Sequence, residues 1–193
     1  MSKHSLELLK SKFGEMIGVD HPDLNHIVSK FEGRKTKRNE ILQKSGEVSR
    51  YVFFVNKGCG RTYYIQPDGG ESTRYIAIEG DFFSSLSSFI TQQPTLEFVQ
   101  AIEPSELLMI SRNNFTELLN TSLAFEKIYR QSMEYAYLLT TWRLESFITR
   151  DAKARYEFLL QTDPDLVLRL SNKIVASYLG ISQETLSRLK SKI

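Results

Sequence analysis

The sequence predicts an α+β protein: an N-terminal helical cap, a double-stranded β-helix roll, a long helix and a C-terminal helix-turn-helix. Two changes of texture along the 193 residues support this prediction. Residues 33 to 111 consist of short runs rich in Val, Ile, Phe and Tyr between turns that contain Gly or Asp, a pattern typical of the strands of a small roll. After Arg112 neither Gly nor Pro occurs until Pro164, which predicts helices over this long stretch.

The N-terminal segment, residues 3 to 31, predicts two short helices that form the cap. Leu9, Phe13 and Met16 repeat at helical spacing in the first helix. Pro22 suits the start of the second helix, because its fixed backbone angle fits a first helical turn.

The stretch from residue 113 to 149 is expected to be one continuous helix or two abutting helices. Within it Ile128, Tyr135 and Trp142 recur every seven residues, and Leu139 lies four residues after Tyr135. Such a stripe predicts a seam through which two copies of the chain pair. The alternative is that the stripe packs on the roll of its own chain.

The last 23 residues predict a helix-turn-helix. A helix from Asn172 to Leu179 is followed by Gly180, which suits a helix end, and by Ser182, which can cap the next helix with its hydroxyl. The second helix leaves polar side chains on one face. The segment has four basic side chains and one acidic side chain, a net charge of +3, whereas the whole chain has a net charge of +2. Small and fork-shaped polar groups in this arrangement can read base edges in a major groove. The alternative is a helical hairpin with a solvated polar face.

The composition excludes several classes of protein. Cys59 is the only cysteine, so we expect no internal disulfide and no cysteine-bound zinc or iron–sulfur cluster. The three histidines all precede the roll, and no nucleophile–histidine spacing or phosphate-binding glycine loop occurs, so we expect neither a metal site nor an enzyme. No run of 18 apolar residues and no secretory signal occur, which indicates a cytoplasmic protein without a membrane partner.

Three segments are expected. They are a helical cap and β-roll sensor domain over residues 1–112, a long dimerisation helix over residues 113–149 and a helix-turn-helix DNA-binding domain over residues 150–193.

The order of these elements resembles the Crp/Fnr family of bacterial transcription regulators from about Leu24 to Ile193. In the roll, residues 46 to 83 are similar to the family's succession of a Gly-Glu turn, an aromatic strand, a Lys-Gly turn, a hairpin and a Gly-Asp turn. In the helix-turn-helix of residues 171–193, which we call the reader, GISQETLSR (180 to 188) resembles the signature of the family's recognition helix. The resemblance implies a cyclic-nucleotide-binding-like roll and a homodimer that binds palindromic promoter sites. Its partners would be double-stranded DNA, a second copy of the chain and RNA polymerase.

The resemblance also implies roles for residues of the reader. Arg188 would approach a guanine and Glu184 a cytosine edge, which suits a guanidinium fork and a carboxylate acceptor. Gln183 and Ser187 would complete the base-reading face. The positions where the family touches phosphates are occupied by Ser171, Lys173, Ser182 and Thr185.

The candidate effector pocket departs from the family's pattern. Pro94 and Thr95 stand around the position of the arginine that pairs with a cyclic phosphate in the family, so we do not expect cyclic AMP to bind. Another small-molecule effector, or none, is left open. The implied pocket residues are Gly80, Asp81, Phe82, Phe83, Ser84, Thr95, Thr140 and Thr141.

The chain stops at Ile193, before the β-hairpin wing that the family usually places after its recognition helix. We therefore expect fewer phosphate contacts. A ligand-binding roll that regulates a protein partner through its C-terminal helices is the alternative function.

Overall fold

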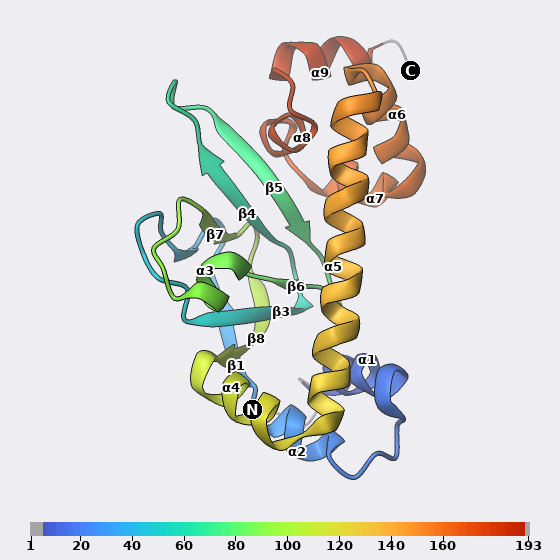
Figure 1. Cartoon of the computed structure of the whole chain (residues 1–193). Helices are drawn as coiled ribbons and strands as arrows, with labels where there is room; N and C mark the ends of the chain where they lie inside the picture. Colours follow the sequence, from blue (N-terminus) through green and yellow to red (C-terminus); the bar gives the residue numbers. More distant parts are fainter. Residues whose placement is uncertain (1–5, 192–193) are drawn as a thin grey trace. The chain divides into compact units, whose positions relative to one another are not determined.

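The computed structural model describes residues 6–191 and confirms the predicted α+β fold (Figure 1). The first three residues of the predicted cap, 3–5, lie outside the described residues, as do Lys192 and Ile193. The helices are α1 (Glu7–Ile17), α2 (Leu24–Ser29), α3 (Leu86–Thr91), α4 (Arg112–Thr121), α5 (Leu123–Thr149), α6 (Ala152–Thr162), α7 (Pro164–Arg169), α8 (Asn172–Leu179) and α9 (Gln183–Lys190). The strands are β1 (Glu32–Thr36), β2 (Ile41–Gln43), β3 (Tyr51–Lys57), β4 (Gly60–Ile65), β5 (Glu71–Ala77), β6 (Phe82–Phe83), β7 (Phe98–Ala101) and β8 (Ser105–Ser111).

The roll consists of two four-stranded sheets, in the orders β1-β8-β3-β6 and β2-β7-β4-β5. Strand β3 shows why the sequence forms this roll, because its side chains alternate between two apolar clusters. Phe53 and Val55 join the interior of the roll with Val99, whereas Phe54 joins the cluster formed with the helical cap. Both faces of β3 are therefore covered, and it reads as an almost continuous apolar run.

The helical cap packs on the outer face of the sheet that contains β3. Phe13, Leu24 and Ile27 are at most 1% exposed and share one cluster with Phe54. The first turns of α5 complete this cluster through Phe125. The predicted cap is thus a structural part of the roll domain.

The predicted stretch after Arg112 divides into two helices at Ser122. Its backbone is extended (φ −130°, ψ 109°), which ends α4. The Ser122 hydroxyl donates to Asp23 (2.8 Å) and accepts from the Phe125 N–H (3.2 Å), so the same residue caps α5. Neither Gly nor Pro is needed for this break. Helices α3 and α7 were not expected from the sequence, and α7 begins at Pro164, which suits a first helical turn.

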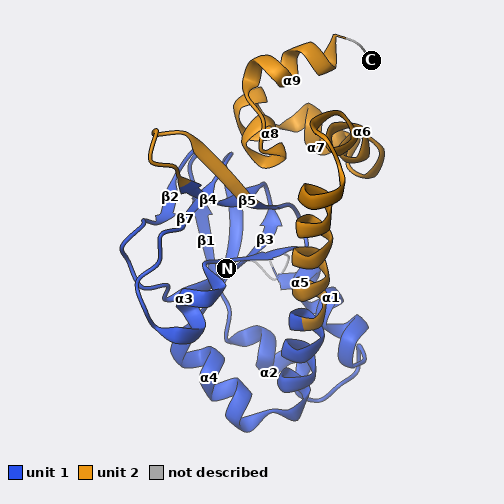
Figure 2. Cartoon of the chain, turned by 45° about the horizontal axis from the view of Figure 1, so that its top comes forward, with its two compact units in different colours: residues 1–64, 75–133 blue, residues 65–74, 134–193 orange. Residues whose placement is uncertain are grey.

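The described chain divides into two compact units (Figure 2). Unit 1 contains residues 1–64 and 75–133, and unit 2 contains residues 65–74 and 134–193. The tip of the β4–β5 hairpin therefore clusters with the C-terminal helices. The predicted boundaries at residues 112 and 149 follow changes of secondary structure and stay predictions. None of the described helices combines the length and apolar composition that a membrane-spanning segment needs.

Gly58 is the glycine whose replacement tests the packing of the roll. Its φ is +109°, and a Cβ there would lie 2.2 Å from the Ser105 Oγ and 2.8 Å from the Ser105 Cα. Gly46 has a similar φ of +87° but open space around it.

We expect Gly46→Ala to lower the free energy of unfolding by about 1–2 kcal/mol through backbone strain alone. Gly58→Ala should cost about 1–3 kcal/mol more through overlap. Urea unfolding measures both, and equal losses would contradict this account.

Candidate nucleic-acid interface

The two C-terminal helices start and end at the residues that the sequence indicates. The Ser171 and Ser182 hydroxyls accept the backbone N–H of Ile174 and Thr185, respectively, and so cap α8 and α9. Gly180 ends α8 in the left-handed region (φ 66°, ψ 40°). The helix pair is therefore specified by local chemistry.

A small apolar core fixes α9 against α8. Leu186 is fully buried, and Val175 and Leu179 are at most 3% exposed. At the other side of the pair the Lys190 ammonium donates to the Asn172 side chain (2.6 Å). Because one face of α9 is buried in this way, its other face is left to solvent.

The predicted base readers occupy that solvent face. Gln183, Glu184, Ser187 and Arg188 are all exposed, at the spacing of one helix face. Within the part of the chain that the structure describes, the Arg188 side chain makes only a long contact with the Glu184 carbonyl oxygen (3.5 Å). Its guanidinium fork therefore points away from the apolar core and is accessible to a partner. These base-reading roles stay predictions.

The predicted phosphate contacts are already engaged within the chain. The hydroxyls of Ser171 and Ser182 serve as helix caps, and the Thr185 hydroxyl lies 3.1 Å from that of Ser182. Lys173 forms an ion pair with Glu71 of β5, 102 residues away in the sequence. No local pattern in the sequence indicates this partner.

Arg143 of α5 is a further residue that the sequence analysis missed. Its Nη2 donates to the carbonyl oxygens of Thr73 (2.8 Å) and Tyr178 (2.7 Å), and its guanidinium lies over the Tyr178 ring (4.1 Å). Burial lowers the pKa of Arg143, while the interaction with Tyr178 raises it. An arginine stays charged at neutral pH in such surroundings.

A second arginine completes the end of α8. Arg155 of α6 donates from Nε to the Leu179 carbonyl oxygen (3.1 Å) and from Nη1 to the Arg150 carbonyl oxygen (2.8 Å). The last carbonyls of a helix have no partner within the helix and carry partial negative charge. Arg143 and Arg155 satisfy them here, and both guanidinium groups lie 4.9 Å from the centroid of the Phe147 ring. These contacts hold α8 on α5 and α6.

The predicted effector residues are divided between the two units, and their assignment to a pocket stays a prediction. Phe82 packs into the helical cap, 4.9 Å from the Phe54 ring and 5.9 Å from the Phe13 ring, so its inclusion in the pocket is corrected. The period-two alternation of a strand explains this, since Phe83 next to it faces the roll interior. Gly80 and Asp81 form a turn in which the Asp81 carboxylate accepts the Ile78 N–H (3.1 Å).

The remaining predicted residues lie apart along the chain. Ser84 and Thr95 are buried in unit 1. Thr140 and Thr141 lie on α5 in unit 2, where the Thr140 hydroxyl donates to the Ala136 carbonyl oxygen (2.8 Å).

A buried carboxylate stands near the position where the family places its phosphate-binding arginine. The Ser85 hydroxyl donates to the Glu97 carboxylate (2.6 Å) and lies 2.9 Å from the Thr95 hydroxyl. The Glu97 N–H also donates to Thr95 (3.1 Å), and Glu97 is only 3% exposed. The sequence analysis did not single out Ser85 or Glu97.

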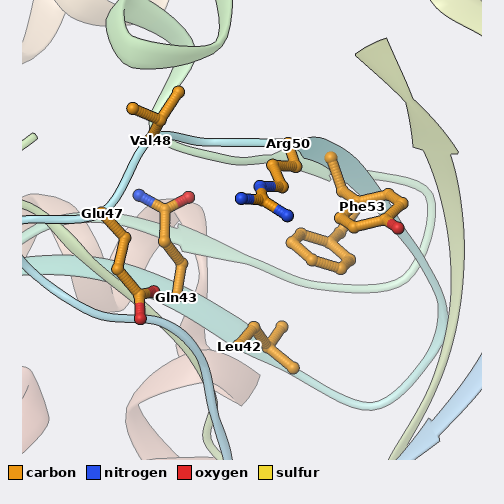
Figure 3. Close-up of a pocket in the computed structure, with 7 residues that line it drawn as sticks. Leu42, Gln43, Glu47, Val48, Arg50 and Phe53 are labelled. Carbon is orange, nitrogen blue, oxygen red and sulfur yellow. The ribbon is translucent and has the colours of Figure 1, made fainter. Parts of the chain in front are cut away.

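A cavity of about 480 Å³ opens in unit 1 beside β2 and β3 (Figure 3). The Gln43 amide and the Arg50 guanidinium face each other across it, and Phe53 lies below them. Gln43 is 7% exposed, and its Nε2 has no hydrogen-bond partner among the described residues. A buried amide of this kind is satisfied when an acceptor enters the cavity. The lining residues are Leu42, Gln43, Glu47, Val48, Arg50, Tyr51 and Phe53, none of them predicted.

The predicted dimer stripe on α5 is exposed only in its second half. Tyr135 and Trp142 are 54% and 53% exposed, and Leu139 is half-buried. Ile128 is 3% exposed and packs in the core with the helical cap, so its assignment to the dimer surface is corrected. Leu138, 44% exposed, lies on the same side of the helix as Tyr135 and Trp142. The available apolar stripe is therefore Tyr135, Leu138 and Trp142.

The comparisons with known proteins agree with this architecture. Residues 33–122 match the family model of the cyclic nucleotide-binding domain. The anaerobic regulatory protein of Pasteurella multocida strain Pm70 is 24% identical over 191 residues, which cover 91% of this chain and 68% of that protein. Residues 33–122 are thus a domain of the cyclic nucleotide-binding type, and nearly the whole chain is similar to a regulatory protein.

Two solved structures show the same fold. FixK2 from Bradyrhizobium japonicum superposes with a TM-score of 0.72 at 20% identity and covers 84% of this chain and 83% of its own. A variant of CooA from Carboxydothermus hydrogenoformans gives 0.68 at 24% identity, with 86% and 78% covered. The resemblance to Crp/Fnr regulators predicted from the sequence is confirmed at the level of the fold. Its relatives are regulatory proteins rather than enzymes.

The cap of the second reader helix can be tested by a single substitution. Ser182→Ala removes the acceptor for the Thr185 N–H and should lower the free energy of unfolding by about 0.5–2 kcal/mol. Ser187→Ala lies on the exposed face of α9 with the same change of atoms and should change it by less than about 0.5 kcal/mol. Thermal or urea unfolding compares the two, and a neutral Ser182→Ala would argue against the cap.

Proposed function

We propose that the protein binds specific palindromic DNA sites as a homodimer and regulates transcription from them. One observation carries this proposal: α9 presents four exposed polar side chains on one face while its opposite face is fixed to α8. An α-helix held in this way fits the width of a major groove. Arg188 supplies a fork for guanine and Glu184 an acceptor for cytosine, and Gln183 and Ser187 flank them.

The charge of the reader supports the same partner. The segment from Ser171 onward carries the chain's excess of positive charge, and Arg188 and Lys190 lie in the last turn of α9. Phosphate contacts from basic side chains and capped helix ends set the register of such a reader on DNA without conveying sequence. Ser171, Lys173, Ser182 and Thr185 are the proposed contacts.

Dimerisation is supported by the exposed stripe of Tyr135, Leu138 and Trp142. Large apolar side chains at helical spacing with more than two fifths of their surface exposed are unfavourable in water unless a partner covers them. A two-fold pair of long helices would place two readers on half-sites one helical turn of DNA apart. RNA polymerase is the further partner of a regulator of this kind.

A second function, the binding of a small-molecule effector by the roll, rests on the cavity at Gln43. Its amide donor and the Arg50 guanidinium suit an anionic or carbonyl group, while Phe53 and Leu42 suit an apolar body. Cyclic AMP is not the effector that we propose, because Pro94 and Thr95 stand around the position where the resemblance would place a phosphate-binding arginine. An adaptor that regulates a protein partner would use the same cavity but would not bind DNA.

Base reading by Arg188 predicts a loss confined to one position of each half-site. Arg188→Ala should remove about 1–3 kcal/mol of discrimination at that base pair and leave preferences at the other positions intact. Lys190→Ala removes the same charge from the same helix, and it should leave discrimination unchanged. Anisotropy titrations against single-base variants of a selected palindrome measure this. Equal loss at every position for Arg188→Ala would contradict the assignment.

The dimer stripe predicts a change of mass. Trp142→Glu places a charge within the exposed stripe, at its C-terminal end, and should halve the mass measured by light scattering, because a charge buried in an apolar interface is strongly unfavourable. Leu168→Glu makes a matched change at an 85% exposed leucine of α7, away from the stripe, and should leave the mass unchanged. A Trp142→Glu protein that keeps the native mass would argue against this surface.

A further inference from the structure

The hairpin between β4 and β5 has a well-defined tip. The Gln66 N–H donates to the Gly70 carbonyl oxygen (2.7 Å), and the Gly69 N–H donates back to Gln66 (2.9 Å). Gly69 has a φ of +83°, and the Asp68 carboxylate accepts the Gly70 N–H (2.8 Å). These bonds make the tip a structured turn. Residues 65–74 belong to the same compact unit as the reader helices.

Three polar contacts join this hairpin to α8 and α5 within unit 2. The Glu71 carboxylate pairs with the Lys173 ammonium, and the Thr73 and Ser177 hydroxyls share a hydrogen bond of 2.6 Å. The Thr73 carbonyl oxygen accepts from Arg143 (2.8 Å). Each contact comes from a different group of the hairpin, so the docking is not one incidental ion pair.

The contacts with α8 lie on a single face. Lys173 and Ser177 are four residues apart, which places them one above the other on the helix. Strand β5 runs along this face with Glu71 at Lys173 and Thr73 at Ser177. Lys173 is also a proposed phosphate contact. The Glu71 carboxylate therefore presents the same chemistry to Lys173, a pair of anionic oxygens, that a DNA phosphate would present.

We propose that the β4–β5 hairpin is an autoinhibitory strap, in which Glu71 occupies Lys173 and withholds one phosphate contact from DNA. This inference rests on the proposed DNA-binding function. In the strapped state the protein binds DNA through one lysine fewer per reader. In the released state Lys173 turns to the DNA backbone, and affinity rises for every sequence alike because phosphates convey no sequence.

Water reaches the ion pair of the strap from one side. The Lys173 side chain is 58% exposed and that of Glu71 18%, so releasing the lysine costs less than breaking a fully buried pair. Arg143 holds the Thr73 carbonyl oxygen and the end of α8 with the same Nη2, so it sets where β5 lies on α8. Because β4 and β5 continue from the hairpin into a sheet of the roll, a shift of these strands moves Glu71 directly.

The test compares the salt dependence of DNA binding in the full chain. Glu71→Gln should tighten binding to a selected palindrome and to scrambled DNA by the same factor, roughly two- to fivefold at physiological salt. The slope of log affinity against log salt should steepen by about 0.9 for each reader, the value for one added phosphate contact. Glu157→Gln is the matched control, since it removes the same charge from an ion pair with Lys153 on α6. It should leave the slope unchanged.

Lys173 is tested in the same experiment. In the Lys173→Ala background, Glu71→Gln should give no gain in affinity and no steeper slope, so that the double variant binds DNA like Lys173→Ala alone. A native slope in Glu71→Gln, or a gain that persists without Lys173, overturns the strap. A native slope would mean that breaking the ion pair frees no phosphate contact. A gain without Lys173 would mean that removing the charge of Glu71 strengthens DNA binding in a general way.

The failure of the proposed function would look different. Suppose that the native protein and Glu71→Gln each bind the palindrome and scrambled DNA equally well, while the salt slope of Glu71→Gln is still steeper. That result would overturn sequence specificity and support the strap. Absence of DNA binding by every variant at low salt would overturn both. Unfolding of the same four proteins gives the coupling between Glu71 and Lys173 without DNA. A coupling of up to about fivefold in the unfolding equilibrium supports the ion pair in solution, and zero coupling counts against it.

Discussion

The C-terminal unit depends on the satisfaction of one helix end. Helix α8 ends at Gly180 with carbonyl oxygens that have no partner within the helix, and Arg143 and Arg155 donate to two of them. The guanidinium groups also lie over aromatic rings, so that cation–π contact offsets part of the cost of burying their charge. Because Arg143 comes from α5 and Arg155 from α6, both helices are tied to the reader. Without these donors the carbonyl oxygens would face apolar surroundings unpaired.

The same arginine explains why the hairpin belongs with the reader rather than with the rest of the roll. The guanidinium has several donors in a fixed geometry, and its Nη2 meets a carbonyl oxygen from α8 and one from β5. The roll and the reader are thereby connected by strands as well as by the long helix. Lysine, with a single flexible ammonium, could not hold both oxygens and stack on Tyr178 at the same time.

Local chemistry made much of the fold predictable from the sequence. Gly180 and Ser182 mark helix boundaries through the backbone conformation and the hydroxyl that they supply, and the alternation around Phe53 marks a strand buried on both faces. The burial of individual side chains could not be predicted where the same heptad spacing continues from the core to the exposed part of one helix. Ile128 and Trp142 share a heptad, yet one lies in the core and the other is exposed, since only the first turns of α5 meet the cap. Contacts such as Glu71 with Lys173 join residues so distant in sequence that no spacing rule applies to them.

The uneven burial of α5 has a thermodynamic consequence for the living cell. The helix has 27 residues and is roughly 40 Å long. Its first turns are anchored by a core, whereas its outer turns carry aromatic side chains exposed to water. In the proposed homodimer a second copy of the chain would cover this surface and stabilise the helix by mass action, so the order of the helix would rise with the concentration of the chain. Because Arg143 ties the reader to these outer turns, the reader would be held more rigidly in the dimer than in the monomer.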